Sequence, residues 1–255
     1  MASSSLQLLR HDLPFLNTST ARLIRPHTLS PLVGTRVAEH DVGNHPAAER
    51  FSLATHALGA VLALVGMLWL VGRSEGVVAS VAYAVYGASL VVLFAASALH
   101  HAIPRAGPHG DRLRRLDHVS IYLFIAGTYT PVCVLALPRG VGVPMLVAVW
   151  AFGVVGIALK LLRPFTSRWV SIALYVGMGW TAVFGAVPVA QVFPLEGILL
   201  LAGGGVVYTL GAFVYAAKRP DPWPESVGSH GVWHLLVLAG AALQFAFIAR
   251  YVPAG

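Results

Sequence analysis

The sequence predicts an all-α integral membrane protein: a bundle of seven transmembrane helices with a cytoplasmic N-terminus and an external C-terminus. Of the 255 residues, 57% are hydrophobic and 11% are charged, whereas soluble domains average roughly 45–50% apolar and about 25% charged residues. The hydrophobic residues are gathered into seven runs separated by short polar breaks. A helix of about 20 residues crosses about 30 Å of hydrocarbon, so each run is long enough to span a membrane.

Residues 1–48 precede these runs and are predicted to form a flexible cytoplasmic tail, while residues 49–255 form the transmembrane domain. The tail is rich in Ser and Thr and carries four arginines, a composition that buries too little apolar surface to fold alone. Up to Ala38 its lone acid is Asp12. An organellar presequence is therefore the alternative interpretation of this segment.

Each of the seven runs is predicted to be a helix, because backbone groups in lipid must form their hydrogen bonds within their own segment. Pro131 and Pro188 lie inside predicted spans and should kink or loosen them. The glycines at 203–205 and Gly211 favour close helix packing. The predicted spans are 51–71, 77–99, 119–137, 141–161, 169–189, 195–217 and 232–252.

The basic residues predict the orientation of the bundle. With the N-terminus inside, fourteen of the 17 Lys and Arg residues fall in cytoplasmic segments, as the positive-inside rule requires. The formal charge of +7 is spread over short loops and shows no basic patch with interleaved aromatics, so we expect no nucleic-acid partner. The single cysteine, Cys133, excludes a disulfide within the chain.

Histidines and acids gather at the predicted cytoplasmic ends of the helices. Ionisable groups in membrane segments are costly and therefore tend to be functional, so their convergence at one depth predicts a site there. The outer ends carry only scattered charges. The candidates are Glu49 and His56 in the first span, His100 and His101 in the second, Asp117 and His118 in the third, and His230 and His234 in the seventh.

The spacing of two of these histidines favours a metal site. His230 and His234 stand four residues apart and share one helix face, and neutral imidazole is a good ligand for Zn²⁺. Either His101 or His100 supplies the third ligand, which leaves a fourth tetrahedral position for water, as in catalytic zinc sites. Asp117 can orient the imidazoles or accept a proton from that water.

Each residue taken alone has a structural alternative. A single histidine near a membrane interface is more often a hydrogen-bonded structural group than a ligand. In the same interpretation Asp117 forms a surface ion pair with neighbouring arginines, Ser97 bonds its own helix backbone, and Glu49 is an exposed acid in a first helical turn.

Five short motifs are more specific than the histidine spacing. They are SALHH at 97–101, LDHVSIYLFIAGTYTP at 116–131, YVGMGW at 175–180, YTLG at 208–211 and HGVWH at 230–234. Together they resemble the hemolysin III family, which belongs with the progestin and adipoQ receptors. The longest motif is highly specific, and the resemblance covers about four-fifths of the chain.

The resemblance implies seven helices with a cytoplasmic N-terminus and a zinc ion held by His101, His230 and His234. It selects His101 over His100, because His101 stands four residues after the motif's serine. It also places Asp117 near the water on that zinc and Ser97 just behind the ligands. The family is distantly similar to alkaline ceramidases, which implies hydrolysis of a lipid amide.

The sequence departs from the family pattern without losing a predicted ligand. His100 stands where an aromatic residue is usual, Ser52 where bacterial members tend to have Asn, and Gly231 where an acid often follows the first histidine of the motif. Gln244 stands where a further histidine is frequent.

The leading functional hypothesis is a zinc-dependent membrane hydrolase whose substrate is a membrane lipid, either ceramide-like or a fatty acyl amide or ester. One alternative is a membrane receptor, sensor or lipid-homeostasis factor that is stabilised by zinc without catalysis. Another is a lytic or transport protein, although transporters place polar groups near the bilayer midplane and these polar residues crowd one end. We expect the protein in the plasma or inner membrane, with an organellar membrane as the alternative.

Overall fold

The computed structural model describes residues 45–103, 108–162 and 167–255, and these ranges contain helices and turns but no strand. Seven helical segments within them are long and apolar enough to cross a membrane. The predicted all-α fold class is therefore confirmed. Almost all of the predicted tail lies outside the described residues, since the first helix begins at Pro46.

The helical boundaries agree with the predicted spans to within a few residues, except at the start of the third span. There the helix begins at Pro108, because its polar first turns continue the helix beyond the apolar run. The helices are α1 Pro46–Gly72, α2 Val77–Ala102, α3 Pro108–Pro131, η1 Val132–Ala136, α4 Arg139–Leu162, α5 Arg168–Gly179, η2 Trp180–Gly185, α6 Ala186–Val192, α7 Leu195–Ala217 and α8 Gly228–Tyr251.

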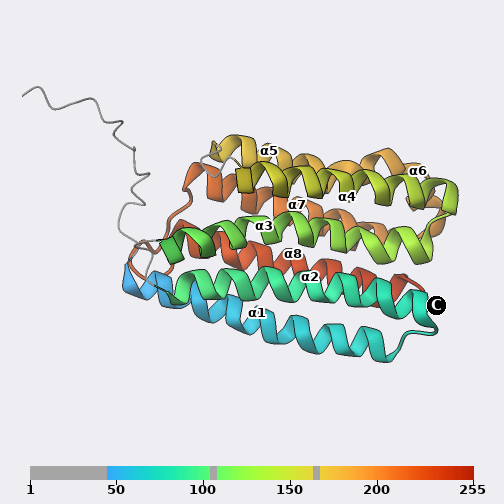
Figure 1. Ribbon diagram of the computed structural model, residues 1–255, viewed down its shortest axis with the longest axis horizontal. Helices are drawn as coiled ribbons and strands as arrows, with labels where there is room; N and C mark the ends of the chain where they lie inside the picture. Colours follow the sequence, from blue (N-terminus) through green and yellow to red (C-terminus); the bar gives the residue numbers. More distant parts are fainter. Residues whose placement is uncertain (1–44, 104–107, 163–166) are drawn as a thin grey trace, which may run out of the picture. The chain divides into compact units, whose positions relative to one another are not determined.

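The helices of residues 45–255 run side by side as a bundle (Figure 1), and the contacts between them form a closed circuit. Helix α1 packs against α2 and α8, α2 against α3, α3 against α4 and α5, α5 against α7, and α7 against α8. The start of α1, the end of α2 and the starts of α3 and α8 consequently lie at one end of the bundle (Figure 1). That this end faces the cytoplasm remains a prediction from the distribution of charge.

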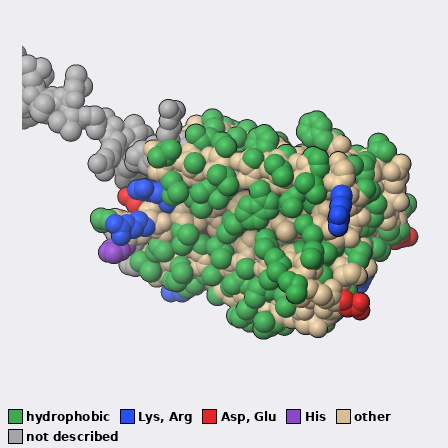
Figure 2. All heavy atoms as spheres, turned by 45° about the vertical axis from the view of Figure 1, so that its right-hand side comes forward, with side chains coloured by type: hydrophobic (Ala, Val, Ile, Leu, Met, Phe, Trp, Pro, Cys, Tyr) green, Lys and Arg blue, Asp and Glu red, His purple; other side chains and the backbone are tan. Residues whose placement is uncertain are grey.

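The outer face of the bundle is apolar. Figure 2 shows hydrophobic side chains covering the visible face, with most charged side chains near its two ends. Leu62 on α1, Val147 on α4 and Leu199 on α7 are each about 60% exposed. Such a continuous apolar surface would be unfavourable in water and matches the hydrocarbon of a bilayer. The protein is an integral, multi-pass membrane protein.

The two prolines predicted to disturb spans lie beside irregular helix. The π-helical turn η1 directly follows Pro131, and the narrow 3₁₀ segment η2 precedes Pro188. Proline has no N–H and its ring collides with the carbonyl four residues earlier, which for Pro188 falls within η2. The Tyr129 hydroxyl stabilises this break by donating to the Gly179 carbonyl at 2.6 Å and accepting from the Ala182 N–H at 2.9 Å.

Close approach of α3 and α4 depends on a glycine. Gly156 of α4 lies against the ring of the buried Tyr122, and a Cβ at this position would collide with that ring. We expect Gly156→Ala to lower the free energy of unfolding by about 1–3 kcal/mol, because an aromatic ring in a packed core cannot yield. Gly140→Ala on the same helix is the matched control, since its Cβ would enter open space. Thermal unfolding of the purified variants in detergent measures both, and equal stability of the two would contradict the prediction.

Candidate metal centre

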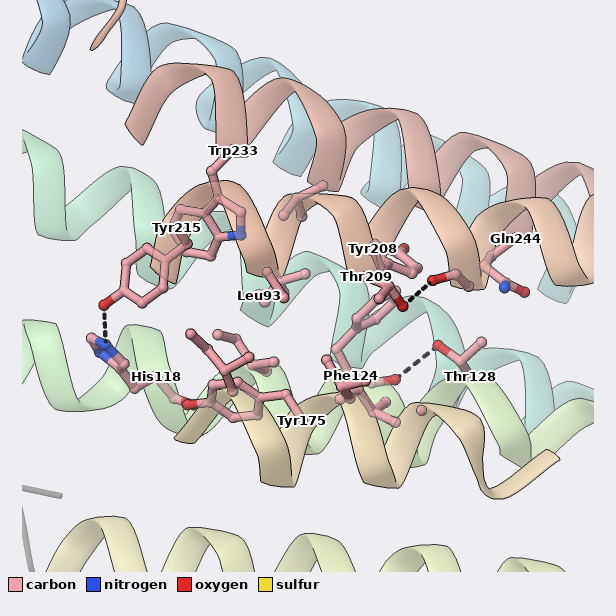
Figure 3. A pocket seen from close by; sticks show the side chains of 18 of the residues that line it. Leu93, His118, Phe124, Thr128, Tyr175, Tyr208, Thr209, Tyr215, Trp233 and Gln244 are labelled. Atoms are coloured by element: carbon pink, nitrogen blue, oxygen red, sulfur yellow. Dashed lines mark hydrogen bonds between the residues drawn. The ribbon is translucent and has the colours of Figure 1, made fainter. Parts of the chain in front are cut away.

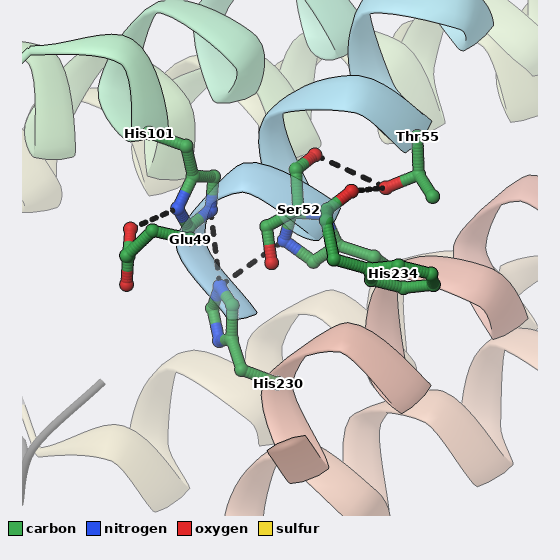
Figure 4. A network of polar contacts seen from close by, with 7 residues as sticks. Glu49, Ser52, Thr55, His101, His230 and His234 are labelled. Carbon is green, nitrogen blue, oxygen red and sulfur yellow. Dashed lines mark hydrogen bonds and ion pairs between the residues drawn. The ribbon is translucent and has the colours of Figure 1, made fainter. Parts of the chain in front are cut away.

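Two helix ends bring the three predicted histidine ligands together (Figure 4). His101 lies in the last turn of α2, and His230 and His234 lie in the first two turns of α8. The His230 Nε2 atom is 3.2 Å from His101 Nε2 and 3.1 Å from His234 Nε2. One ligand atom from each residue lies within 4.8 Å of the others, so the three side chains are close enough to bind one metal ion.

The spacing of these nitrogens fits Zn²⁺. Zinc–imidazole bonds of 2.0–2.1 Å at tetrahedral angles place neighbouring ligand nitrogens about 3.3 Å apart, close to both Nε2 separations of His230. A neutral imidazole carries a proton on only one nitrogen, so a cation could be bound by the three Nε2 lone pairs at once. His101 and His234 are buried and His230 is half-buried, so the ion would be largely shielded from solvent.

Glu49 joins the cluster from the first turn of α1. Its Oε2 atom lies 2.9 Å from His101 Nδ1, so an Nδ1–H can donate to the carboxylate and leave the Nε2 lone pair directed at the other histidines. Carboxylates that hold a ligand histidine in this way fix its tautomer and increase its basicity. The half-buried Glu49 is therefore a partner of the histidine cluster, and the alternative of an exposed first-turn acid is wrong.

We expect Glu49→Gln to weaken zinc binding by about 10- to 100-fold, because the amide keeps a hydrogen-bond acceptor but loses the charge. Titration against a competing chelator measures the zinc affinity of the purified protein. Glu196→Gln is the matched control, since Glu196 is an exposed acid in the first turn of α7. Equal affinity in both variants would show that the Glu49 contact does not support metal binding.

His100 and His56 lie beside the cluster without belonging to it. The His100 ring centroid is 5.2 Å from that of His101, and the group of three that can share an ion excludes His100. His56 is 2% exposed and stacks on His234 with ring centroids 3.6 Å apart. Its two ring nitrogens have no hydrogen-bond partner within the described part of the chain. His56 of α1 therefore packs directly against His234 and faces the interior of the bundle.

Ser97 and Asp117 line a cavity of about 160 Å³, whose wall also includes His56, the residue that stacks on His234. Ser97 precedes His101 by one turn of α2, is 1% exposed, and has a hydroxyl without a hydrogen-bond partner among the described residues. Asp117 is 5% exposed, so the alternative of a surface carboxylate is wrong. Arg114, one of the two neighbouring arginines, lies 3.4 Å from the exposed Asp111.

His118 also lines this cavity and is held by hydrogen bonds to neighbouring helices. Its Nδ1 lies 2.6 Å from the Arg114 carbonyl and its Nε2 3.4 Å from the Tyr215 hydroxyl. The Tyr175 hydroxyl donates to the His118 carbonyl at 3.1 Å. These bonds tie α3 to α5 and α7, and His118 lies outside the group of three histidines.

The rest of the cavity is mainly apolar and extends along the bundle (Figure 3). Sequence reasoning did not identify these lining residues as part of a site, although several lie inside the quoted motifs, as Trp233 does between the two α8 histidines. The side chains that enclose it come from α2, α3, α5, α7 and α8 and include Leu93, Phe124, Tyr175, Tyr208, Tyr215, Trp233 and Gln244.

Comparison with known proteins gives matches over the part of the chain that contains the histidine cluster and the cavity. Residues 44–245 match the profile of the family described as "Haemolysin-III related". The chain is 33% identical to Hemolysin-3 of Bacillus cereus over 204 residues, which cover 78% of this chain and 89% of that protein. It is 30% identical to the Hemolysin-3 homolog of Bacillus subtilis (strain 168), covering 77% and 91%. It is 27% identical to the monocyte to macrophage differentiation factor of Homo sapiens, covering 78% and 82%.

Proposed function

The chain belongs to the haemolysin III-related family, and from this premise and the geometry of the site we propose that it is a zinc-dependent membrane hydrolase acting on a lipid amide or ester. The observation that carries the proposal is the convergence of three imidazole nitrogens beside a cavity with a buried carboxylate on its wall. Burying a carboxylate in a protein interior costs free energy, and buried ionisable groups concentrate at functional sites.

In this proposal some side chains bind the metal ion and another transfers protons. His101, His230 and His234 would bind Zn²⁺ through Nε2, and Glu49 would hold the His101 ring in place. Zinc in this position supplies a Lewis acid that polarises a carbonyl and makes water a better nucleophile near neutral pH.

Asp117 is placed to carry the proton in this proposal. Its carboxylate accepts a proton from the water that attacks the carbonyl and returns it to the leaving nitrogen or oxygen. One water is consumed, the bond between the carbonyl carbon and its leaving atom breaks, and a fatty acid and an amine or alcohol are released. The Ser97 hydroxyl, which has no partner among the described side chains and backbone, is available to hydrogen-bond the polar end of the substrate.

The cavity supports a lipid as the substrate. Its walls are built largely from aliphatic and aromatic side chains, which favour an acyl chain and exclude water from the reacting group. Ser97 and Asp117 line this cavity together with His56, which stacks on His234, so a chain whose carbonyl lies at these residues would present it beside the histidine cluster. We propose a ceramide-like lipid or a fatty acyl amide as the substrate class.

The alternative is a zinc-stabilised receptor or sensor. The observation that favours it is that the histidines join α2 to α8 and that Glu49 adds α1. A metal ion would therefore cross-link three helix ends. In that case removal of zinc lowers the thermal stability of the protein and no lipid is consumed.

The test is hydrolysis by zinc-replete protein in lipid nanodiscs, with a ceramide, an oleoyl amide and an oleoyl ester as substrates and mass spectrometry of the products. Release of fatty acid that stops on chelation and returns with added zinc is the expected result. Zinc-replete protein that leaves all three lipids intact would favour the receptor. Leakage of dye from protein-containing liposomes would instead support a lytic function, which the name Hemolysin-3 of the relatives describes.

A further inference from the structure

The polar groups deep in the cavity are not all satisfied. The Thr128 and Thr209 hydroxyls bond backbone carbonyls one helical turn earlier, and the Trp180 indole donates to Thr209 at 3.0 Å. The Gln244 Oε1 atom and the Tyr208 hydroxyl, in contrast, are buried without a hydrogen-bond partner in the ranges that the structure describes. Buried polar atoms are rarely left unpaired in folded proteins, so this pair indicates a missing polar partner.

The orientation of the Gln244 amide is fixed by its other hydrogen bond. Its Nε2 donates to the Leu201 carbonyl at 3.1 Å, and a carbonyl can only accept, so the amide cannot be turned round. Gln244 is 6% exposed. Its Oε1 is therefore a buried hydrogen-bond acceptor with no donor among the described residues.

Tyr208 supplies the complementary group from α7. Its ring packs against Gly240, one turn before Gln244 on α8, where an added Cβ would lie 2.7 Å from the ring. Both side chains line the cavity, and Figure 3 places them towards the end away from His118. A tyrosine hydroxyl can both donate and accept, so each of the two residues offers an unpaired polar atom to a ligand hydroxyl in the cavity.

The distance from the histidines defines where that hydroxyl would sit on a ligand. Gln244 follows His234 by ten residues of the same helix, which places it about 15 Å further along the bundle. A second cavity of about 210 Å³ also has Gln244 and Trp180 in its wall, so the two cavities meet at this depth. A chain that starts at the histidines can pass the Gln244 amide and continue beyond it.

We propose that the cavity selects an acyl chain bearing a hydroxyl about 15 Å from the group at the histidines. The hydroxyl donates to Gln244 Oε1 and accepts from the Tyr208 hydroxyl. An unsubstituted chain would leave both atoms unpaired, because it displaces any water without replacing its hydrogen bonds. This inference rests on the proposed lipid function and names the specificity of the same site.

The test compares oleic acid with ricinoleic acid, which differ by one mid-chain hydroxyl. Binding of each acid to zinc-replete protein is measured by native mass spectrometry, and hydrolysis of plain oleoyl amide is measured in parallel. We expect ricinoleic acid to bind about 2- to 10-fold more tightly, as one or two neutral hydrogen bonds allow. Gln244→Leu should bring the ratio of the two affinities close to one.

Two further variants serve as a second test and as a control for the binding preference. Tyr208→Phe keeps the ring and should also reduce the preference, while Gln191→Leu makes the same chemical change at an exposed position of α6 and should leave the preference intact. Equal binding of the two acids to wild-type protein, or a preference that survives in both Gln244→Leu and Tyr208→Phe, would overturn this inference alone. Failure of both acids to bind would overturn it together with the lipid specificity, whereas loss of oleoyl amide hydrolysis alone concerns only the proposed catalysis.

Discussion

Replacing His230 by alanine should abolish both bound zinc and lipid hydrolysis. His230 Nε2 lies within 3.2 Å of the Nε2 atoms of both other histidines, so its removal takes away the nitrogen at the centre of the group. Loss of a residue that merely supports a ligand costs about 10- to 100-fold in metal affinity, and loss of a ligand should cost more. Metal analysis of the purified protein and product release from an acyl amide measure the two effects.

His100→Ala is the matched control for this prediction. His100 is buried on α2 next to His101 but lies outside the group of three, so this variant should retain its zinc. A His230→Ala protein that keeps wild-type zinc content would contradict the assignment of the ligands. Loss of zinc in His100→Ala, with retention in His101→Ala, would instead transfer the third ligand to the neighbouring residue.

The fold was predictable because lipid imposes a simple rule on the sequence. A segment that crosses hydrocarbon must be apolar and helical, so the seven spans and most of their limits followed from composition. The start of α3 did not, because the helix continues through polar residues such as Asp111 and Arg112, where hydropathy carries no signal. The break at η2 was expected near Pro188, but the role of Tyr129 in stabilising it depends on a contact between distant residues.

The histidine cluster was only partly predictable. The spacing of His230 and His234 fixes their common face, whereas the residues alone left His100 and His101 open as third ligand. Neighbouring residues on a helix point in different directions. The register of the family motif favoured His101, and the packing of α2 against the rest of the bundle places His101 in the group of three. The Glu49–His101 contact joins residues 52 positions apart, and no local pattern predicts such a pair.

The polar residues deep in the cavity were the part of the site that the sequence predicted least. Gln244 was noticeable only as a departure from a family pattern, because a single polar residue in an apolar helix does not reveal which way it faces. The pairing of Gly204 with Gln244, where an added Cβ would approach the amide to 2.7 Å, arises from the packing of α7 on α8. Small residues predicted close packing, but their partners required the three-dimensional structure.

The second large effect is expected for Asp117→Asn, which should retain zinc and lose hydrolysis. The amide occupies the same volume as the carboxylate and keeps an acceptor oxygen, but it cannot take up a proton from water. Loss of a general acid–base group typically costs about 10²- to 10⁴-fold in rate. Asp111→Asn is the matched control, because Asp111 is an exposed acid at the start of the same helix and should leave the rate unchanged.

The combination of zinc content and rate in Asp117→Asn separates the two roles proposed for this carboxylate, proton transfer and positioning of the histidines. Normal zinc with a rate reduced as expected places the carboxylate in proton transfer, as proposed for a hydrolase. Loss of zinc together with rate would assign Asp117 to holding the histidines, since a buried carboxylate can also position ligands. Normal zinc with an unchanged rate would remove Asp117 from the chemistry altogether. Proton transfer would then fall to another group beside the histidines, whereas zinc-replete wild-type protein without any hydrolysis is the result that favours a structural metal joining α2 to α8.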